Sequence, residues 1–161
     1  MKVVSDAGPI IALSRIGKLK LLKRYFGRIF IPKEVYDQIV ERGRGKPGSE
    51  EVEKYDWFEA KEVGNRIAVN SLSVDLEKGE AEAIILSLEL EADLILMDDF
   101  NAREIAKAMG LSVLGTVGIL VKASQDGIIE NLKETLEELR RKGIRISNEV
   151  IEYALTLAGE R

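Results

Sequence analysis

Short apolar runs alternate with amphipathic stretches along most of the chain. Residues 2–5 form a β-branched run that ends at Asp6, and apolar residues then recur at helical spacing over residues 10–16. Residues 93–97 form a continuous apolar run, which is typical of a strand buried on both faces of a parallel sheet. The pattern therefore predicts a strand, a turn and a helix at the start, and a central buried strand further along.

The same pattern predicts a regular succession of elements. We expect strands at residues 2–5, 28–31, 58–63, 66–69, 93–97 and 112–114. We expect helices at residues 10–16, 19–26, 32–40, 77–90, 101–109, 116–124, 129–142 and 148–157, with a short charged helix before Trp57. This alternation predicts the α/β class: a three-layer α/β/α fold with a mostly parallel sheet of about four or five strands.

The sequence predicts one domain. It shows neither an internal repeat nor a second apolar core, and a folded chain of 161 residues buries enough surface to need no disulfide or structural metal. We predict a single domain over residues 1–161, with a core at about 2–125 and a C-terminal helical extension at about 128–158. Leu155 and Leu157 of that extension are apolar residues that a homodimer could cover.

Composition removes most catalytic mechanisms. The chain has no histidine and no cysteine, which excludes a zinc finger, a thiol nucleophile, a Ser-His-Asp triad and a haem-ligating histidine. Any catalysis must therefore use carboxylates, Lys, Ser, Thr or Tyr.

Charge and hydropathy limit the classes of partner and the cellular compartment that we expect. The 24 basic and 28 acidic residues give a net charge of −4, which argues against a protein that wraps DNA electrostatically but leaves a local nucleic-acid site open. The sequence has no signal-peptide pattern and no apolar run of about eighteen residues, so we expect a cytoplasmic location and no membrane association.

Acidic residues follow two of the predicted strands. Asp6 ends the first strand, and Asp98 and Asp99 directly follow the buried strand. Because ligands of open parallel sheets bind outside the carboxyl ends of the strands, these positions are candidates for a site. Glu80 and Glu82 lie at the start of the helix predicted at residues 77–90. Because two residues of a helix turn by about 200°, the two side chains point in different directions, and only one of them can face that site.

Carboxylates gathered at one sheet edge repel one another, and they suit a hard divalent cation such as Mg²⁺ or Mn²⁺. Such an ion supports phosphodiester hydrolysis without histidine or cysteine. The alternative is structural: Asp6, and Asp98 or Asp99, are good N-cap residues, and Glu80 is favoured by the dipole of its helix. The residues alone leave both interpretations open.

Five segments, in this order, together resemble a PIN domain, and more narrowly the prokaryotic PIN-like proteins related to the toxins of toxin–antitoxin pairs. The resemblance covers about residues 2–125. Its segments are residues 4–13, 31–36, 79–84, 96–103 and 115–120.

This resemblance implies a metal-dependent ribonuclease, with three or four acidic residues around one or two Mg²⁺ or Mn²⁺ ions. By position, Asp6, Glu80 and Asp98 match the metal-binding acids, with Asp99 next. RNA is then the implied substrate, and a toxin of this kind would have an antitoxin protein as its partner.

Gln38 departs from the family pattern. It stands where many PIN domains carry a glutamate, in the segment Pro32-Lys33-Glu34-Val35-Tyr36-Asp37-Gln38. An amide offers a carbonyl oxygen but no charge, so Gln38 should weaken metal affinity. The alternative function is therefore a catalytically weak or inactive PIN-like module that binds RNA or protein. A metal-dependent phosphatase or a nuclease acting on DNA would use the same carboxylates.

Two hydroxyl groups and several basic residues are accessory candidates. Ser5 and Thr116 could orient a water molecule or contact phosphate, although Thr116 after Gly115 also fits a helix N-cap. Phosphate contacts position an RNA backbone without reading its sequence. The candidates for such contacts are Arg15, Lys18, Arg44, Lys46 and Arg103.

Overall fold

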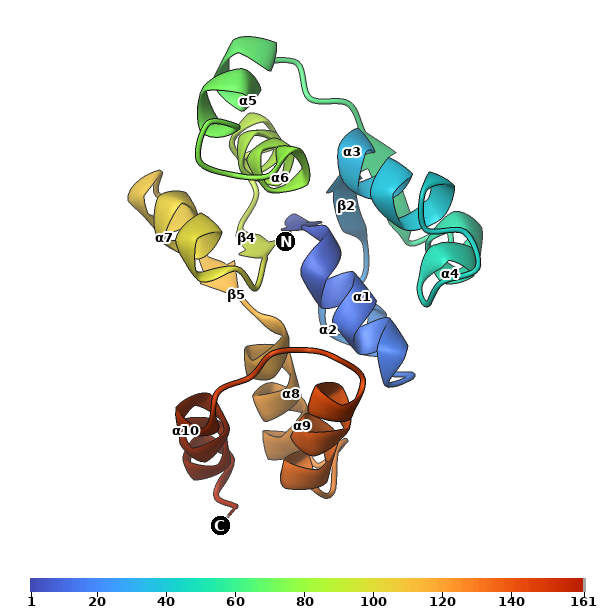
Figure 1. Ribbon diagram of the computed structural model, residues 1–161, viewed down its shortest axis with the longest axis vertical. Coiled ribbons are helices and arrows are strands. Elements are labelled where there is room, and N and C mark those ends of the chain that lie inside the picture. Colours follow the sequence, from blue (N-terminus) through green and yellow to red (C-terminus); the bar gives the residue numbers. More distant parts are fainter. Residues whose placement is uncertain (161) are drawn as a thin grey trace.

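Five parallel strands form the centre of the molecule. The computed structural model describes residues 1–160, and its sheet has the strand order β3-β2-β1-β4-β5 (Figure 1). The strands are β1 (Val3–Ser5), β2 (Ile29–Pro32), β3 (Phe58–Lys61), β4 (Leu94–Leu96) and β5 (Val113–Leu114). Every neighbouring pair is parallel, which confirms the expected sheet.

Helices connect the strands and complete the C-terminal part of the chain. They are α1 (Ala7–Arg15), α2 (Lys20–Phe26), α3 (Lys33–Tyr36), the π-helix η1 (Asp37–Glu41), α4 (Ser49–Lys54), α5 (Arg66–Leu72), α6 (Lys78–Glu89), α7 (Phe100–Ala108), α8 (Thr116–Gln125), α9 (Leu132–Arg141) and α10 (Asn148–Ala158). No described helix has the length and apolar character needed to cross a membrane.

The sheet has an apolar cluster on each face, because successive residues of a strand point to opposite sides. Val3 belongs to the cluster with α1, α2 and α8, whereas Val4 belongs to the cluster with α5, α6 and α7. In β4, Leu96 joins the first cluster and Ile95 the second. Two helical layers therefore enclose the sheet, and the predicted α/β/α fold is confirmed.

One predicted strand is wrong. Residues 66–69 lie in α5, whose first turn is capped by the side chain of Asn65, which accepts a hydrogen bond of 3.0 Å from the backbone N–H of Ala68. Val69 and Leu72, three residues apart on α5, contact the second cluster at helical spacing. A window of four residues was too short to show that spacing, so the β-branched residues suggested a strand.

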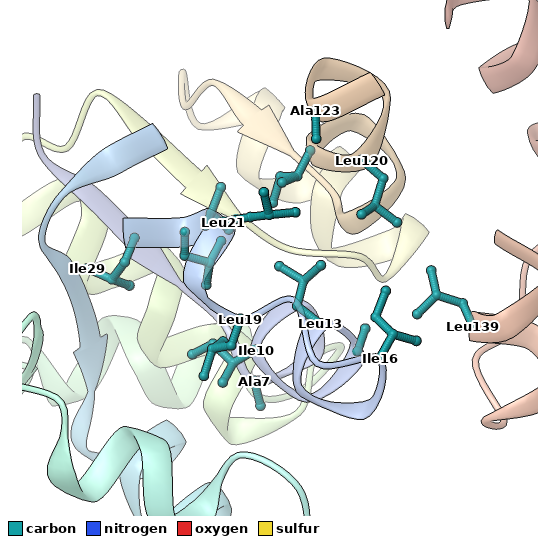
Figure 2. Packing of buried hydrophobic residues seen from close by; sticks show 14 of the residues in the cluster. Ala7, Ile10, Leu13, Ile16, Leu19, Leu21, Ile29, Leu120, Ala123 and Leu139 are labelled. Atoms are coloured by element: carbon teal, nitrogen blue, oxygen red, sulfur yellow. The ribbon is translucent and has the colours of Figure 1, made fainter. Parts of the chain in front are cut away.

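The C-terminal helices share the first apolar cluster with the rest of the chain. Leu132, Leu136 and Leu139 of α9 are fully buried in it. Figure 2 shows Leu139 pointing toward Leu13 and Ile16 at the end of α1. Leu155 is also buried by its own chain, at 9% exposure, so it needs no second copy to cover it, whereas Leu157 is 48% exposed.

The topology places a crevice between β1 and β4. These strands are neighbours, with Ser5 paired to Leu96, but their following helices pack on opposite faces of the sheet. The chain thus leaves β1 toward one side and β4 toward the other. In open parallel sheets, this switch point is where ligands bind.

Candidate active site

Asp6 lies at the carboxyl end of β1, inside the crevice. Its backbone N–H donates a hydrogen bond of 2.9 Å to the carbonyl oxygen of Leu96, which ties it to β4. The residue occupies the N-cap position of α1, but its side chain makes no capping hydrogen bond. Asp6 is only 7% exposed, so its carboxyl group is buried without serving as a helix cap.

Asp98 is held by α8. Its Oδ1 accepts a hydrogen bond of 2.7 Å from the backbone N–H of Thr116, and its Oδ2 accepts one of 2.6 Å from the Thr116 hydroxyl. Gly115, not Thr116, is the N-cap of α8, so the capping interpretation of Thr116 is wrong. The Thr116 side chain instead fixes the orientation of the Asp98 carboxylate.

Asp99 acts as a helix cap, which is the structural role that its position allowed. It is the N-cap of α7, and its Oδ2 accepts a hydrogen bond of 2.9 Å from the backbone N–H of Ala102. This bond uses one lone pair of the carboxylate and leaves the other oxygen free for a ligand.

Glu80 and Glu82 face different sides of α6, as their spacing predicted. Glu80 Oε1 accepts a hydrogen bond of 3.0 Å from the N–H of Glu77, and the two residues form a reciprocal capping box. Glu82 is buried elsewhere, where it accepts hydrogen bonds from the N–H of Glu34 at 3.1 Å and from Arg66 at 2.9 Å. Only Glu80 therefore belongs to the crevice.

These side chains line one cavity of about 190 Å³. Its lining contains five carboxylates and the amide of Gln38, but no lysine or arginine. The residues are Asp6, Ala7, Gly8, Ile11, Gln38, Glu77, Gly79, Glu80, Asp98 and Asp99. The structure thus brings together the four predicted acids and Gln38. Sequence analysis missed Glu77, because glutamate is not a preferred N-cap residue.

Two glycines let the elements approach closely around the cavity. A Cβ atom on Gly79 would lie 3.3 Å from Gln38 Oε1 and 3.7 Å from Asp6 Oδ1. A Cβ atom on Gly8 would lie 3.4 Å from Asp98 Oδ2. The amide oxygen of Gln38 and the carboxylate of Asp6 therefore meet at the start of α6.

Burial and mutual repulsion disfavour the charged forms of two acids. Burial is the main cause that raises the pKa of Asp6 to about 7, and the charges of Glu80, Asp98 and Glu77 add to it. Burial, followed by the charges of Asp99 and Glu77, also raises the pKa of Glu80 above its ordinary value. The cavity accumulates negative charge that no protein cation lining it compensates.

The donor chemistry suits a hard divalent cation, since carboxylate and amide oxygens are its preferred ligands. Within residues 1–160, however, no three acidic side chains already stand close enough together to hold a metal ion. Metal binding would therefore require side chains of the cavity to draw together around the ion.

The accessory candidates are largely committed to other partners. The Ser5 hydroxyl donates a hydrogen bond of 2.8 Å to the carbonyl oxygen of Asp6, and Ser5 does not line the cavity. Arg15 donates to the carbonyl oxygen of Lys142, and Arg44 pairs with two glutamates. Arg103 lies nearest the site and donates a hydrogen bond of 3.1 Å to the carbonyl oxygen of Met97.

A comparison with family models agrees with the fold. The family model DUF3368, described as a PIN domain, matches residues 2–160. The match extends beyond the resemblance over residues 2–125 and includes α9 and α10. No curated protein sequence is significantly similar to the chain.

Proposed function

The chain belongs to the PIN domain family, and we propose that it is a ribonuclease that depends on Mg²⁺ or Mn²⁺. PIN domains are in general nucleases, so the fold is of a nuclease type. The observation that carries the proposal is the cavity at the switch point, in which five carboxylates gather without a lysine or an arginine. A buried acid with a purely structural role would be expected to have a cationic partner or to cap a helix, and Asp6 does neither among the described residues.

In this proposal, Asp6, Glu80 and Asp98 hold the ion, with Asp99 next and Gln38 contributing a neutral oxygen. A divalent ion in such a site lowers the pKa of a water molecule and stabilises the charge that develops on the phosphate. The two hydrogen bonds from Thr116 keep Asp98 in one orientation, and the buried position of Asp6 limits its access to bulk water. A cytoplasmic location, and an antitoxin that covers the cavity if the chain is a toxin, belong to the same proposal.

Replacing Asp98 with Asn is expected to weaken Mn²⁺ binding at least about tenfold. The asparagine can keep both contacts with Thr116, because its carbonyl accepts from the backbone N–H and its amide can donate to the hydroxyl oxygen. The loss of charge is then the main change. Calorimetric titration of Mn²⁺, with and without a short single-stranded RNA, measures the effect, and the wild type should cleave that RNA with Mn²⁺ but not with EDTA.

Asp75→Asn is the matched control, since Asp75 is exposed and lies outside the cavity. Its Mn²⁺ affinity should equal that of the wild type. Equal affinities in the wild type and in Asp98→Asn would contradict the metal site. An absence of Mn²⁺ binding in the wild type, even with RNA present, would favour the alternative of an inactive RNA- or protein-binding module.

Gln38 is the observation that favours this alternative, and Gln38→Glu tests it. The change places a further carboxylate beside Asp6 and Gly79, so Mn²⁺ affinity is expected to rise about tenfold, equivalent to about 1.4 kcal/mol. RNA cleavage should increase with it if weak metal binding limits the natural chain. Gln125→Glu, on α8 and outside the cavity, is the control. An unchanged or lower affinity in Gln38→Glu would show that this position does not contact the ion.

A further inference from the structure

A second, larger cavity adjoins the acidic one. It is a groove of about 600 Å³ between α7, α8, α10 and the segment that joins α9 to α10. Its wall is mainly aliphatic, with contributions from Leu114, Val117, Val121, Leu139, Ile144 and Ile146. Figure 1 shows α7 and α10 on the side of the molecule opposite α3 and α4.

Two aromatic side chains stand exposed at this groove. Phe100 is 75% exposed, and it directly follows the Asp98–Asp99 pair in the chain. Tyr153 on α10 is 67% exposed. By contrast, Trp57 is buried at 8% and stacks on Tyr55 and Phe58 within the protein. Phe100 and Tyr153 are therefore aromatic rings that can accept a stacking partner from solution.

The charge of the groove complements a polyanion. Arg103 and Arg145 line it, and neither forms an ion pair with any residue among 1–160. Asp98 is the one carboxylate among the lining residues. Arg145 is exposed, and Arg103 donates one hydrogen bond to the carbonyl oxygen of Met97 but has no carboxylate partner. Guanidinium groups without an acidic partner, beside aromatic rings, are the combination that holds single-stranded nucleic acid, since arginines neutralise phosphates and rings stack on bases.

Asp98 also connects the groove to the proposed cleavage site. It lines both cavities, so the groove begins beside a carboxylate of the proposed metal site. In a duplex the bases are paired and stacked on one another, so their faces are not accessible to aromatic side chains of a protein. Unpaired bases of a single strand can turn outward and stack on aromatic side chains.

We propose that this groove is a nucleobase subsite for single-stranded RNA. It holds the unpaired base or two bases next to the phosphate at the acidic cavity, with Phe100 and Tyr153 as stacking surfaces and Arg103 and Arg145 beside the backbone. The inference rests on the proposed function, because it takes RNA as the substrate.

Binding of a fluorescein-labelled single-stranded RNA decamer tests the subsite. Fluorescence anisotropy is measured in an Asp6→Asn background, so that cleavage does not consume the probe. Phe100→Ala and Tyr153→Ala should each weaken binding about 5- to 100-fold, whereas Tyr153→Phe should keep it. Ile67→Ala is the matched control, because Ile67 is 81% exposed on α5 and lies outside the groove. Mn²⁺ affinity should be the same in all four variants made in the otherwise wild-type chain.

A scan with abasic nucleotides locates the bases that occupy the groove. Removing the base at one or two adjacent positions of the decamer should weaken its binding to the parent protein. The same abasic decamer should lose little further affinity for Tyr153→Ala, because the aromatic ring that stacks on that base is already missing. An equal additional loss in Tyr153→Ala would contradict the subsite.

The outcomes separate this inference from the proposed function. Cleavage that depends on Mn²⁺ and Asp6, with RNA affinity unchanged by Phe100→Ala and Tyr153→Ala, would overturn the subsite alone. Weaker RNA binding in both alanine variants, without any cleavage by the wild type, would support the subsite and contradict the nuclease. Dissociation of a dimer or release of a protein partner by Tyr153→Ala, with RNA affinity unchanged, would identify the groove as a protein interface and overturn the inference.

Discussion

Replacing Asp6 with Asn is expected to stabilise the metal-free protein at pH 8 and also to abolish RNA cleavage. The two effects have one cause. Asp6 is buried among Glu80, Asp98 and Glu77, and this environment raises its pKa to about 7. Its negative charge is therefore unfavourable in the folded state, and asparagine removes the charge while preserving the shape of the side chain. Loss of the same charge removes a ligand from the proposed metal site.

The dependence of stability on pH follows from the direction of this shift. The pKa of Asp6 is about 7 in the folded state, against 3.8 for the unperturbed group. Between these values the folded state holds a proton that the unfolded state has released, so the free energy of unfolding falls as the pH rises. The contribution is full below about pH 4 and is lost by about pH 7, and its size is about 4 kcal/mol. Asp6→Asn should remove this part of the pH dependence.

Urea denaturation in EDTA, at several values between pH 4 and pH 8, measures the difference between the two proteins. The free energy of unfolding of Asp6→Asn relative to the wild type should rise across this range and then level off above pH 7. Asp56→Asn, at an exposed position outside the cavity, should follow the wild type. A constant difference between wild type and Asp6→Asn at all pH values would mean that Asp6 titrates normally. Cleavage by Asp6→Asn at the wild-type rate would contradict its role in the site.

The sequence predicts where the acidic residues lie better than it predicts which hydrogen bonds they form. Asp6 and Asp98 could be placed at one sheet edge because each follows an apolar run, and the neighbouring position of β1 and β4 then brings them together. The hydrogen bonds between Asp98 and Thr116 join residues 18 positions apart, and no local pattern encodes them. Glu77 was missed for a different, local reason: it stands at the N-cap of α6, where serine, threonine, aspartate or asparagine is the usual residue.

Tertiary contacts also determine the structure of the segments in which local preference was misleading. Residues 66–69 suggested a strand, but the Asn65 cap and the burial of Val69 against the second cluster favour a helix. Leu155 suggested a surface for a second copy, but its own chain buries it. Both cases depend on what packs against the segment, and the spacing of a few apolar residues does not contain that information.

Replacing Leu139 with Ala is expected to lower the free energy of unfolding of the whole chain by about 2 to 5 kcal/mol. Leu139 is fully buried and belongs to the cluster that also contains Leu13 and Ile16 (Figure 2). The substitution leaves a cavity between α9 and α1, and rigid neighbours cannot close it completely. The substitution should therefore destabilise the N-terminal helix as well as the C-terminal extension.

This variant tests whether the extension and the core form one domain. If they do, circular dichroism and the fluorescence of Trp57, which lies outside the extension, should report a single transition at a lower midpoint in Leu139→Ala. Leu157→Ala is the control on α10, since Leu157 is 48% exposed and its truncation should cost much less. An early loss of helix with an unchanged Trp57 transition would instead mean that α9 and α10 unfold separately. Because α10 forms part of the wall of the groove, the nucleobase subsite would then depend on a unit that can open without unfolding the acidic site.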